Sequence, residues 1–254
     1  MSINQQKLPE DQLDRNIRHD WSKIYELSCK ELGIQQDKRD KVINLYLVLC
    51  SFLIPFAYNV QISDTGRGLI FLVAAIVGFL FTSVVIRYRI YKEVHWITCS
   101  TVTKMPYLIH VTKDNVQTMF LDTMKKKASS FYSDGILNYG KFKRKNRSSA
   151  ETFSFAILVF LTSIMLGLSL YLLGACWKPV WAPIAMAALA SLIAFWLRMR
   201  SYMRKLFAVY QCLDRSLTSD QFKEAFNTVF EKAWFLHVYF EQQTGEEQSN
   251  GIVE

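Results

Sequence analysis

Four long runs without a charged residue constrain this chain more than any other feature. They hold 22, 19, 26 and 19 residues. A membrane-spanning helix needs about 20 mostly apolar residues to cross about 30 Å of hydrocarbon, and a water-soluble helical protein, the alternative, rarely buries four such runs. The sequence therefore predicts an all-α polytopic membrane protein, whose four transmembrane helices form two hairpins near 42–62, 68–86, 153–175 and 179–197.

The distribution of basic residues predicts the orientation of the chain. Residues 1–41 hold eight Lys and Arg, residues 87–151 hold thirteen, and the tail from Arg198 holds seven, whereas the two short loops hold only Arg67 and Lys178. Segments rich in Lys and Arg stay on the cytoplasmic side. Both termini are therefore expected in the cytoplasm. Residues 1–41 contain no apolar stretch of signal-peptide length, so the first span is expected to act as an uncleaved insertion signal.

These patterns divide the chain into six segments. They are an amphipathic cytoplasmic N-terminal helix (1–41), a first transmembrane hairpin (42–86), a basic cytoplasmic helical region (87–151), a second hairpin (152–197), cytoplasmic helices (198–240) and a disordered acidic tail (241–254). Gly33 is expected to end the first helix, because glycine is common just past helix ends.

Two of the spans are expected to project beyond the bilayer. No Gly or Pro interrupts the chain from Phe79 to Met105, and Pro106 then supplies a break. Likewise, an apolar stripe continues past the fourth span as far as Leu217. Each projection is followed by a second helix, near 112–126 and 218–232, and Thr218-x-x-Gln221 is a capping-box pattern.

The pattern Arg-x-Arg-x-Tyr occurs twice, each time where an apolar run ends. It reads RYRIY at 87–91 and RMRSY at 198–202. Its arginines are expected to hold the helix ends at the headgroups and to take part in gating: Arg87, Arg89, Arg198 and Arg200. The pattern suggests a tandem repeat of hairpin, projecting helix and capped helix. The alternative is that positive-inside selection and interfacial tyrosines produce it at any inward exit.

The sequence offers no catalytic, metal-binding or cofactor-binding motif, so we expect a non-enzymatic protein without a cofactor. The five cysteines form no C-x-x-C pair. The spans contain no carboxylate, Lys, Arg or His at depth, which disfavours a coupled transporter but allows a passive pore. Their polar or helix-breaking residues are candidates for pore lining or, as we favour, for packing: Ser51, Pro55, Thr162 and Ser169. The small residues Ala187, Ala190, Ser191 and Ala194 suit close helix approach.

The middle segment carries the strongest candidate for a binding site. Residues 87–151 hold thirteen basic and five acidic residues. Its basic clusters are interleaved with aromatic residues, and their members are Lys125, Lys126, Lys127, Lys141, Lys143, Arg144, Lys145 and Arg147. Such a surface suits a nucleotide or oligonucleotide, through phosphate contacts and base stacking. It equally suits anionic lipid headgroups at the inner leaflet, and both alternatives stay open.

Paired hairpins, a basic cytoplasmic segment, helical extensions and short outer loops give a layout that resembles the four-transmembrane effectors of bacterial anti-phage systems. Each half is also similar to the related two-transmembrane SLATT-type effectors. The resemblance implies an oligomeric pore or channel in the bacterial inner membrane, gated from the cytoplasm by a nucleotide and surrounded by membrane lipids. The alternative is a non-enzymatic anchor that docks a soluble cytoplasmic partner. A lipid-modifying enzyme using His95 or His110 beside Asp114 is a third reading.

Overall fold

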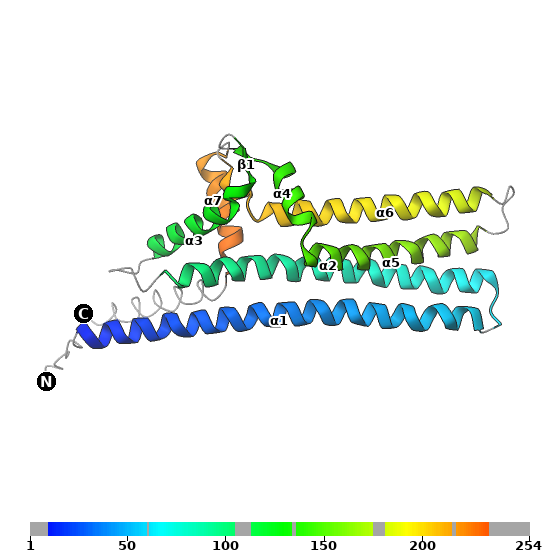
Figure 1. Ribbon diagram of the computed structural model, residues 1–254, viewed down its shortest axis with the longest axis horizontal. Coiled ribbons are helices and arrows are strands. Elements are labelled where there is room, and N and C mark those ends of the chain that lie inside the picture. Colours follow the sequence, from blue (N-terminus) through cyan, green and yellow to red (C-terminus); the bar gives the residue numbers. More distant parts are fainter. Residues whose placement is uncertain are drawn as a thin grey trace, which may run out of the picture. The chain divides into compact units, whose positions relative to one another are not determined.

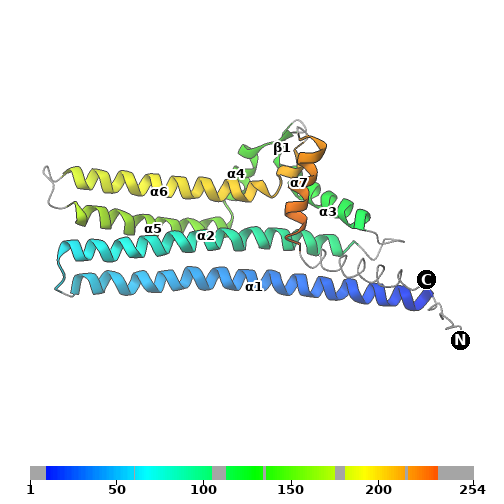
Figure 2. The ribbon, with the colours of Figure 1, turned by 180° about the vertical axis from the view of Figure 1, so that it is seen from behind.

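A computed structural model describes residues 10–59, 61–104, 113–133, 136–174, 181–214 and 217–233, and this part of the chain is all-α (Figures 1 and 2). The helices are α1 (Glu10–Asn59), α2 (Asp64–Val102), α3 (Lys113–Ala128), α4 (Tyr139–Arg147), α5 (Ala150–Leu173), α6 (Trp181–Ala208) and α7 (Ser219–Phe230). There are also two short 3-10 turns: η2 (Ser129–Phe131) follows α3, and η3 (Gln211–Leu213) follows α6. The two-residue strands β1 (Tyr132–Ser133) and β2 (Ile136–Leu137) pair antiparallel.

The four predicted spans are confirmed as helices. Trp21–Asn59 of α1, Asp64–Val102, Ala150–Leu173 and Trp181–Ala208 are each long and apolar enough to cross a membrane. The predicted fold class, an all-α polytopic membrane protein, is therefore correct. The projection of the second span is confirmed as well, because α2 continues as one helix of 39 residues to Val102. Pro106, the expected break, lies outside the described residues.

The chain divides into two compact units, which we describe separately. Unit 1 comprises Met1–Ile34, Tyr91–Ser129 and Arg215–Glu254, and unit 2 comprises Gln35–Ile90 and Ser130–Asp214. Helices α1 and α2 each contribute residues to both units. Unit 2 contains the two hairpins, in which α1 lies beside α2 and α5 lies beside α6 (Figures 1 and 2).

Small residues bring α5 and α6 together in unit 2, as their pattern predicted. A side chain at Gly167 would collide with the hydroxyl of Ser191. Ser191 Oγ donates to the carbonyl oxygens of Ser163 and Ala187, at 2.8 Å from each. In hydrocarbon, where the apolar driving force between helices is weak, such close approach and interhelical hydrogen bonding hold helices together.

A second close contact joins α1, α2 and α5. A Cβ at Gly78 would overlap the side chains of Thr162 and Tyr46. Tyr46 is fully buried and its hydroxyl donates to the Ala74 carbonyl at 3.2 Å. The bulky Tyr46 thus fits only because α2 has glycine opposite it.

The expectation that Gly33 ends the first helix is wrong, because α1 is continuous from Glu10 to Asn59. Trp21, Ile24, Ser28 and Gln35 are all buried, and their spacing of three, four and seven residues carries one helical stripe past Gly33. A glycine inside a helix costs roughly 1 kcal/mol relative to alanine. Packing along this stripe offsets that cost.

Helix α6 is shorter than its apolar stripe indicated, since it ends at Ala208 rather than near Leu217. The chain turns there, with the Tyr210 amide donating to the Phe207 carbonyl at 2.9 Å. The turn buries Tyr210 edge-on against Phe131, with ring centroids 5.5 Å apart. It also buries Cys212 and Leu213. The last buried residues of the stripe, Tyr210 and Leu213, are therefore covered by a folded-back turn and not by a longer helix.

In unit 1 the two expected capped helices pack on each other. The capping box of Thr218 and Gln221 is present at the start of α7. Phe120 of α3 meets Phe226 and Phe230 of α7 edge to face, at centroid distances of 6.2 and 5.4 Å. In the suggested repeat Phe120 and Phe226 are equivalent positions, because each stands eight residues after a threonine, Thr112 or Thr218. The equivalent helices therefore contact each other through equivalent residues. The repeat itself stays a prediction.

Candidate functional site

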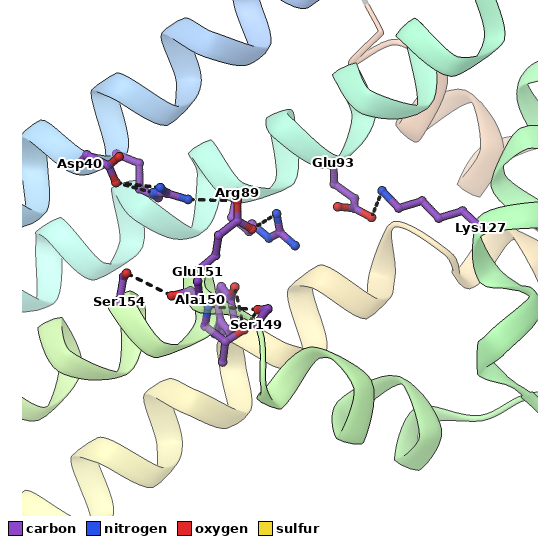
Figure 3. Close-up of polar contacts among 11 residues, drawn as sticks. Asp40, Arg89, Glu93, Lys127, Ser149, Ala150, Glu151 and Ser154 are labelled. Atoms are coloured by element: carbon purple, nitrogen blue, oxygen red, sulfur yellow. Dashed lines mark hydrogen bonds and ion pairs between the residues drawn. The ribbon is translucent and has the colours of Figure 1, made fainter.

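One carboxylate joins three helices at the end of the hairpins in unit 2 (Figure 3). Glu151, in the first turn of α5, pairs with Arg39 of α1 at 3.1 Å and with Arg89 of α2. The side chain of Glu151 is 17 % exposed and those of both arginines are 13 % exposed, so the cluster is largely withdrawn from water. Asp40 adds a second contact to Arg39 at 2.7 Å.

Local sequence explains where Glu151 lies. Ser149 is the N-cap of α5, and its hydroxyl accepts from the Thr152 amide at 3.2 Å. Glu151 therefore sits at the positive end of the helix dipole, which favours its negative charge. Two guanidinium groups and the helix end hold this single carboxylate.

The other predicted exit arginines have different surroundings. Arg198 of α6 donates to Ser83 Oγ of α2 at 3.2 Å and lies 5.0 Å from the Phe79 ring. Arg200 lies 4.9 Å from the Trp196 ring, and its side chain is exposed, as is that of Arg87. Arg89 and Arg198 thus tie helices of unit 2 together, whereas Arg87 and Arg200 face outward.

The basic residues predicted to bind a ligand fall in both units. Lys125, Lys126 and Lys127 belong to α3 in unit 1, and residues 141–147 belong to α4 in unit 2. Lys127 is committed to an internal contact: its Nζ lies 2.6 Å from Glu93 Oε1 of α2 and 3.8 Å from the Trp96 ring centroid (Figure 3). Lys125 makes a solvent-exposed pair with Asp122 at 3.5 Å, and Lys126 is exposed.

On α4, some basic side chains are likewise used internally. Lys141 Nζ donates to the Tyr132 carbonyl at 3.0 Å, and Lys145 Nζ donates to Ser130 Oγ at 2.7 Å. Lys143, Arg144 and Arg147 are exposed. These three make no ion pair within the described ranges.

The residues predicted to line a pore or to pack between helices differ in how deeply they are buried. Thr162 and Ser169 of α5 are fully buried, and the Thr162 hydroxyl donates to the Leu158 carbonyl at 2.8 Å. Ser51 is exposed and donates to the Leu47 carbonyl of its own helix at 2.8 Å. Pro55 lies inside α1, which continues to Asn59. Thr162 therefore has a packing role in this chain.

Sequence reasoning missed the residues that complete the two ion-pair sites: Arg39, Glu93 and Glu151. A signal was present for Glu151, since it is the only carboxylate between Asp134 and Asp214, in a stretch rich in arginine and lysine. In the part of the chain that the structure describes, no group of three His, Cys, Asp or Glu could hold a metal ion.

Comparison with protein-family models, with curated proteins and with solved structures gives no match for this chain. The fold and the helix-end contacts define its class, a polytopic all-α membrane protein with four candidate spans.

Proposed function

We propose that this protein is a pore- or channel-type effector of the bacterial inner membrane, gated from the cytoplasm by a nucleotide ligand or a protein partner and acting in anti-phage defence. The basic segments that flank the spans support an orientation with both termini in the cytoplasm. The layout resembles the four-transmembrane effectors of such systems.

One observation carries the gating part of the proposal. Helix α2 runs without a break from Asp64, at the short loop, to Val102. Its apolar stretch lies in unit 2, and its last residues hold the Glu93–Lys127 contact to α3 in unit 1. A continuous helix is stiff, so a change at α3 has a direct mechanical route into a membrane span. We place the ligand at the exposed Lys125 and Lys126 of α3, next to this contact.

The pore is proposed to form between copies of the chain. The interior of unit 2 is filled by buried side chains such as Tyr46, Phe71, Phe155 and Leu158, so we place the ion path between chains and not through one of them. Only 11 % of the apolar stretch of α6 is buried within the chain, against 39 % for α2 and for α5. Helix α6 is therefore the span with the most surface available to a second copy, which supports a homo-oligomer.

The Glu151 cluster supplies a latch for the closed state in this proposal. It connects α1, α2 and α5 at the ends of the spans, where helix separation would begin. A ligand can open such a pore only if it binds the open arrangement more tightly than the closed one. Breaking the latch lowers the free energy that the ligand must supply.

The test is ion flux from liposomes that contain the purified full-length protein, with and without a panel of cyclic and linear nucleotides. We expect flux with one nucleotide. The double variant K125Q/K126Q, which leaves the Lys127–Glu93 contact intact, should lose the response. The control K23Q/K30Q, which removes two exposed lysines of α1, should keep it. A response that survives K125Q/K126Q would show that the ligand binds elsewhere.

The alternative, a membrane anchor that docks a soluble partner, is favoured by exposed apolar side chains in unit 1. Tyr25 and Leu27 of α1 are 42 % and 38 % exposed. This function predicts a stable complex that co-purifies with the protein and no flux under any condition. Absence of flux from protein shown to be inserted and folded would support it.

A further inference from the structure

Positive charge is concentrated in unit 2. Its residues include sixteen Lys and Arg against six Asp and Glu, a formal charge of +10, whereas the remaining residues of the chain sum to −2. Several of these cations are used internally, as Arg39 and Arg89 are by Glu151. The exposed ones on α4 and on the last turns of α6 form what we call the basic collar: Lys143, Arg144, Arg147, Arg200, Arg204 and Lys205.

The orientation of α4 is fixed by its contacts. Asn138 caps the helix by accepting from the Lys141 amide at 3.0 Å. Phe142 is 1 % exposed and packs edge to face on Phe131 and Phe207, at centroid distances of 5.0 and 5.2 Å. At about 100° per residue, Lys143, Arg144 and Arg147 lie on the side of the helix opposite Phe142. The burial of one phenylalanine therefore turns three cations outward together.

The position of the basic collar relative to the membrane surface follows from helix α5, which comes directly after α4 in the sequence. Helix α5 begins at Ala150, and its predicted span starts at Phe153, which is 68 % exposed on an apolar helix. Three residues of helix rise about 4.5 Å, and each headgroup layer is roughly 5–8 Å thick. Ala150 therefore lies within the headgroup layer when α5 is inserted, and Arg147, which only Ser148 and Ser149 separate from Ala150, is within reach of the headgroups.

The end of α6 gives the same depth independently. Trp196 is 55 % exposed, and Arg200 lies 4.9 Å from its ring. Tryptophan is enriched at the level of the headgroups. Trp196 therefore indicates, independently of α5, that the Arg200 end of the collar lies at the membrane surface.

We infer that the outward face of α4, with Lys143, Arg144 and Arg147, is a binding surface for the phosphate headgroups of acidic phospholipids. The lipid is favoured over a free nucleotide because the surface lies at headgroup depth, and because the aromatic side chain of Phe142 is turned inward and offers no stacking face to a base. Phe142 and Phe131 pack against each other instead. The inference does not depend on pore activity.

The experiment is a titration of full-length protein, in a neutral detergent, with phosphatidylglycerol or phosphatidylcholine, followed by native mass spectrometry and by thermal unfolding. We expect phosphatidylglycerol to bind and to raise the Tm, and phosphatidylcholine to do neither. Each cation near an anionic surface is worth about a fivefold change in affinity. The variant K143Q/R144Q/R147Q should therefore lose at least about tenfold in affinity for phosphatidylglycerol.

Matched variants make the result decisive. K23Q/K30Q/K223Q removes three exposed cations of unit 1 and should bind phosphatidylglycerol as the unaltered protein does. K143R/R144K/R147K keeps the charge and should retain binding. The single variant R147Q should give a graded loss, so the test survives if the triple variant fails to fold. Equal binding by K143Q/R144Q/R147Q and the unaltered protein would overturn the inference. Inorganic phosphate that competes as well as the lipid would overturn it too, because the surface would then be a free-phosphate site.

Discussion

At the residue scale, the loss of Glu151 would have the most consequences for the packing of the helices. It is the shared counter-ion of Arg39 and Arg89. Without it, two guanidinium groups would face each other in a site that is largely closed to water. Removing one partner of a buried ion pair is strongly destabilising, because the remaining charge loses its main counter-ion in a site that water reaches poorly. Arg39 would keep its contact with Asp40 at 2.7 Å.

We therefore predict that E151Q destabilises the protein by about 3 kcal/mol, the lower end of the range for a buried pair, because the site keeps some exposure. Thermal unfolding in detergent measures this as a lower Tm. The control D37N changes an exposed carboxylate of the same unit and should leave the Tm unchanged. If E151Q also opens the pore, liposomes containing it should leak without nucleotide. An unaltered Tm in E151Q would contradict the latch.

Glycine gives a second prediction at this scale, because the chain offers a matched pair. G78A should destabilise the protein, since the added methyl group would collide with Tyr46 and Thr162. G33A should be neutral or should stabilise by roughly 0.5–1 kcal/mol, because nothing lies within 4 Å of its Cβ position and alanine favours a helix. Thermal unfolding of both variants checks the prediction. A loss of stability in G33A would show that the helix is broken there.

These two glycines also show what sequence can reveal. Gly33 was expected to end a helix, and nothing local distinguishes a glycine inside a helix from one just after its end. The difference is made by the burial of neighbours such as Trp21 and Gln35, which depends on the fold and not on the residues next to Gly33. The role of Gly78 is equally invisible in sequence, because it depends on a tyrosine 32 positions earlier and a threonine 84 positions later.

At the scale of elements, the spans could be predicted because their signal is local. A run of about 20 apolar residues has few alternatives to a membrane helix. The end of α6 at Ala208 and the strands β1 and β2 could not, since both depend on packing between Phe131, Phe142 and Tyr210. The basic clusters were found from charge alone. Which lysines are free and which are bound, such as Lys127 to Glu93, required the structure.

The packing of α1 on α2 in unit 1 is testable through two cysteines. Cys29 Sγ and Cys99 Sγ lie 3.5 Å apart, and both are thiols. We predict that mild oxidation with copper phenanthroline forms a Cys29–Cys99 disulfide within one chain, because a small side-chain rotation brings the sulfurs to bonding distance. Non-reducing peptide mapping detects it. The variant C99S should abolish the cross-link, and a cross-link that forms only between chains would contradict this packing.

The reactivity of the Cys212 thiol tests the packing of unit 2. Burial raises the pKa of the Cys212 thiol to about 11, and the thiolate is the reactive form. Below that pKa the thiol is mostly protonated, so its alkylation should stay slow at neutral pH and become faster as the pH approaches 11. Rapid labelling of Cys212 with a maleimide at pH 7 would show that the turn after α6 opens readily.

At the scale of the whole molecule, the asymmetry of charge and the even number of spans lead to one topology. An even number of crossings returns the chain to its starting side. The basic collar belongs to the same ends of the hairpins as the Glu151 cluster. At the other end, residues 60–63 between α1 and α2 include no basic residue. Arg67, in the first turn of α2, pairs with Asp64 at 3.0 Å. Positive charge thus favours the collar end on the cytoplasmic side.

We predict that this topology appears in labelling of single cysteines in intact bacterial cells, with all five native cysteines replaced by serine. Q61C, in the exposed loop before α2, should react with a membrane-impermeant maleimide in intact cells. K126C and K223C, on exposed positions of α3 and α7, should react only after the membrane is permeabilised. The reverse pattern would place the basic collar outside the cell. That outcome would remove the acidic inner leaflet as its partner and the cytoplasmic nucleotide as the ligand, so this one measurement bears on both proposals at once.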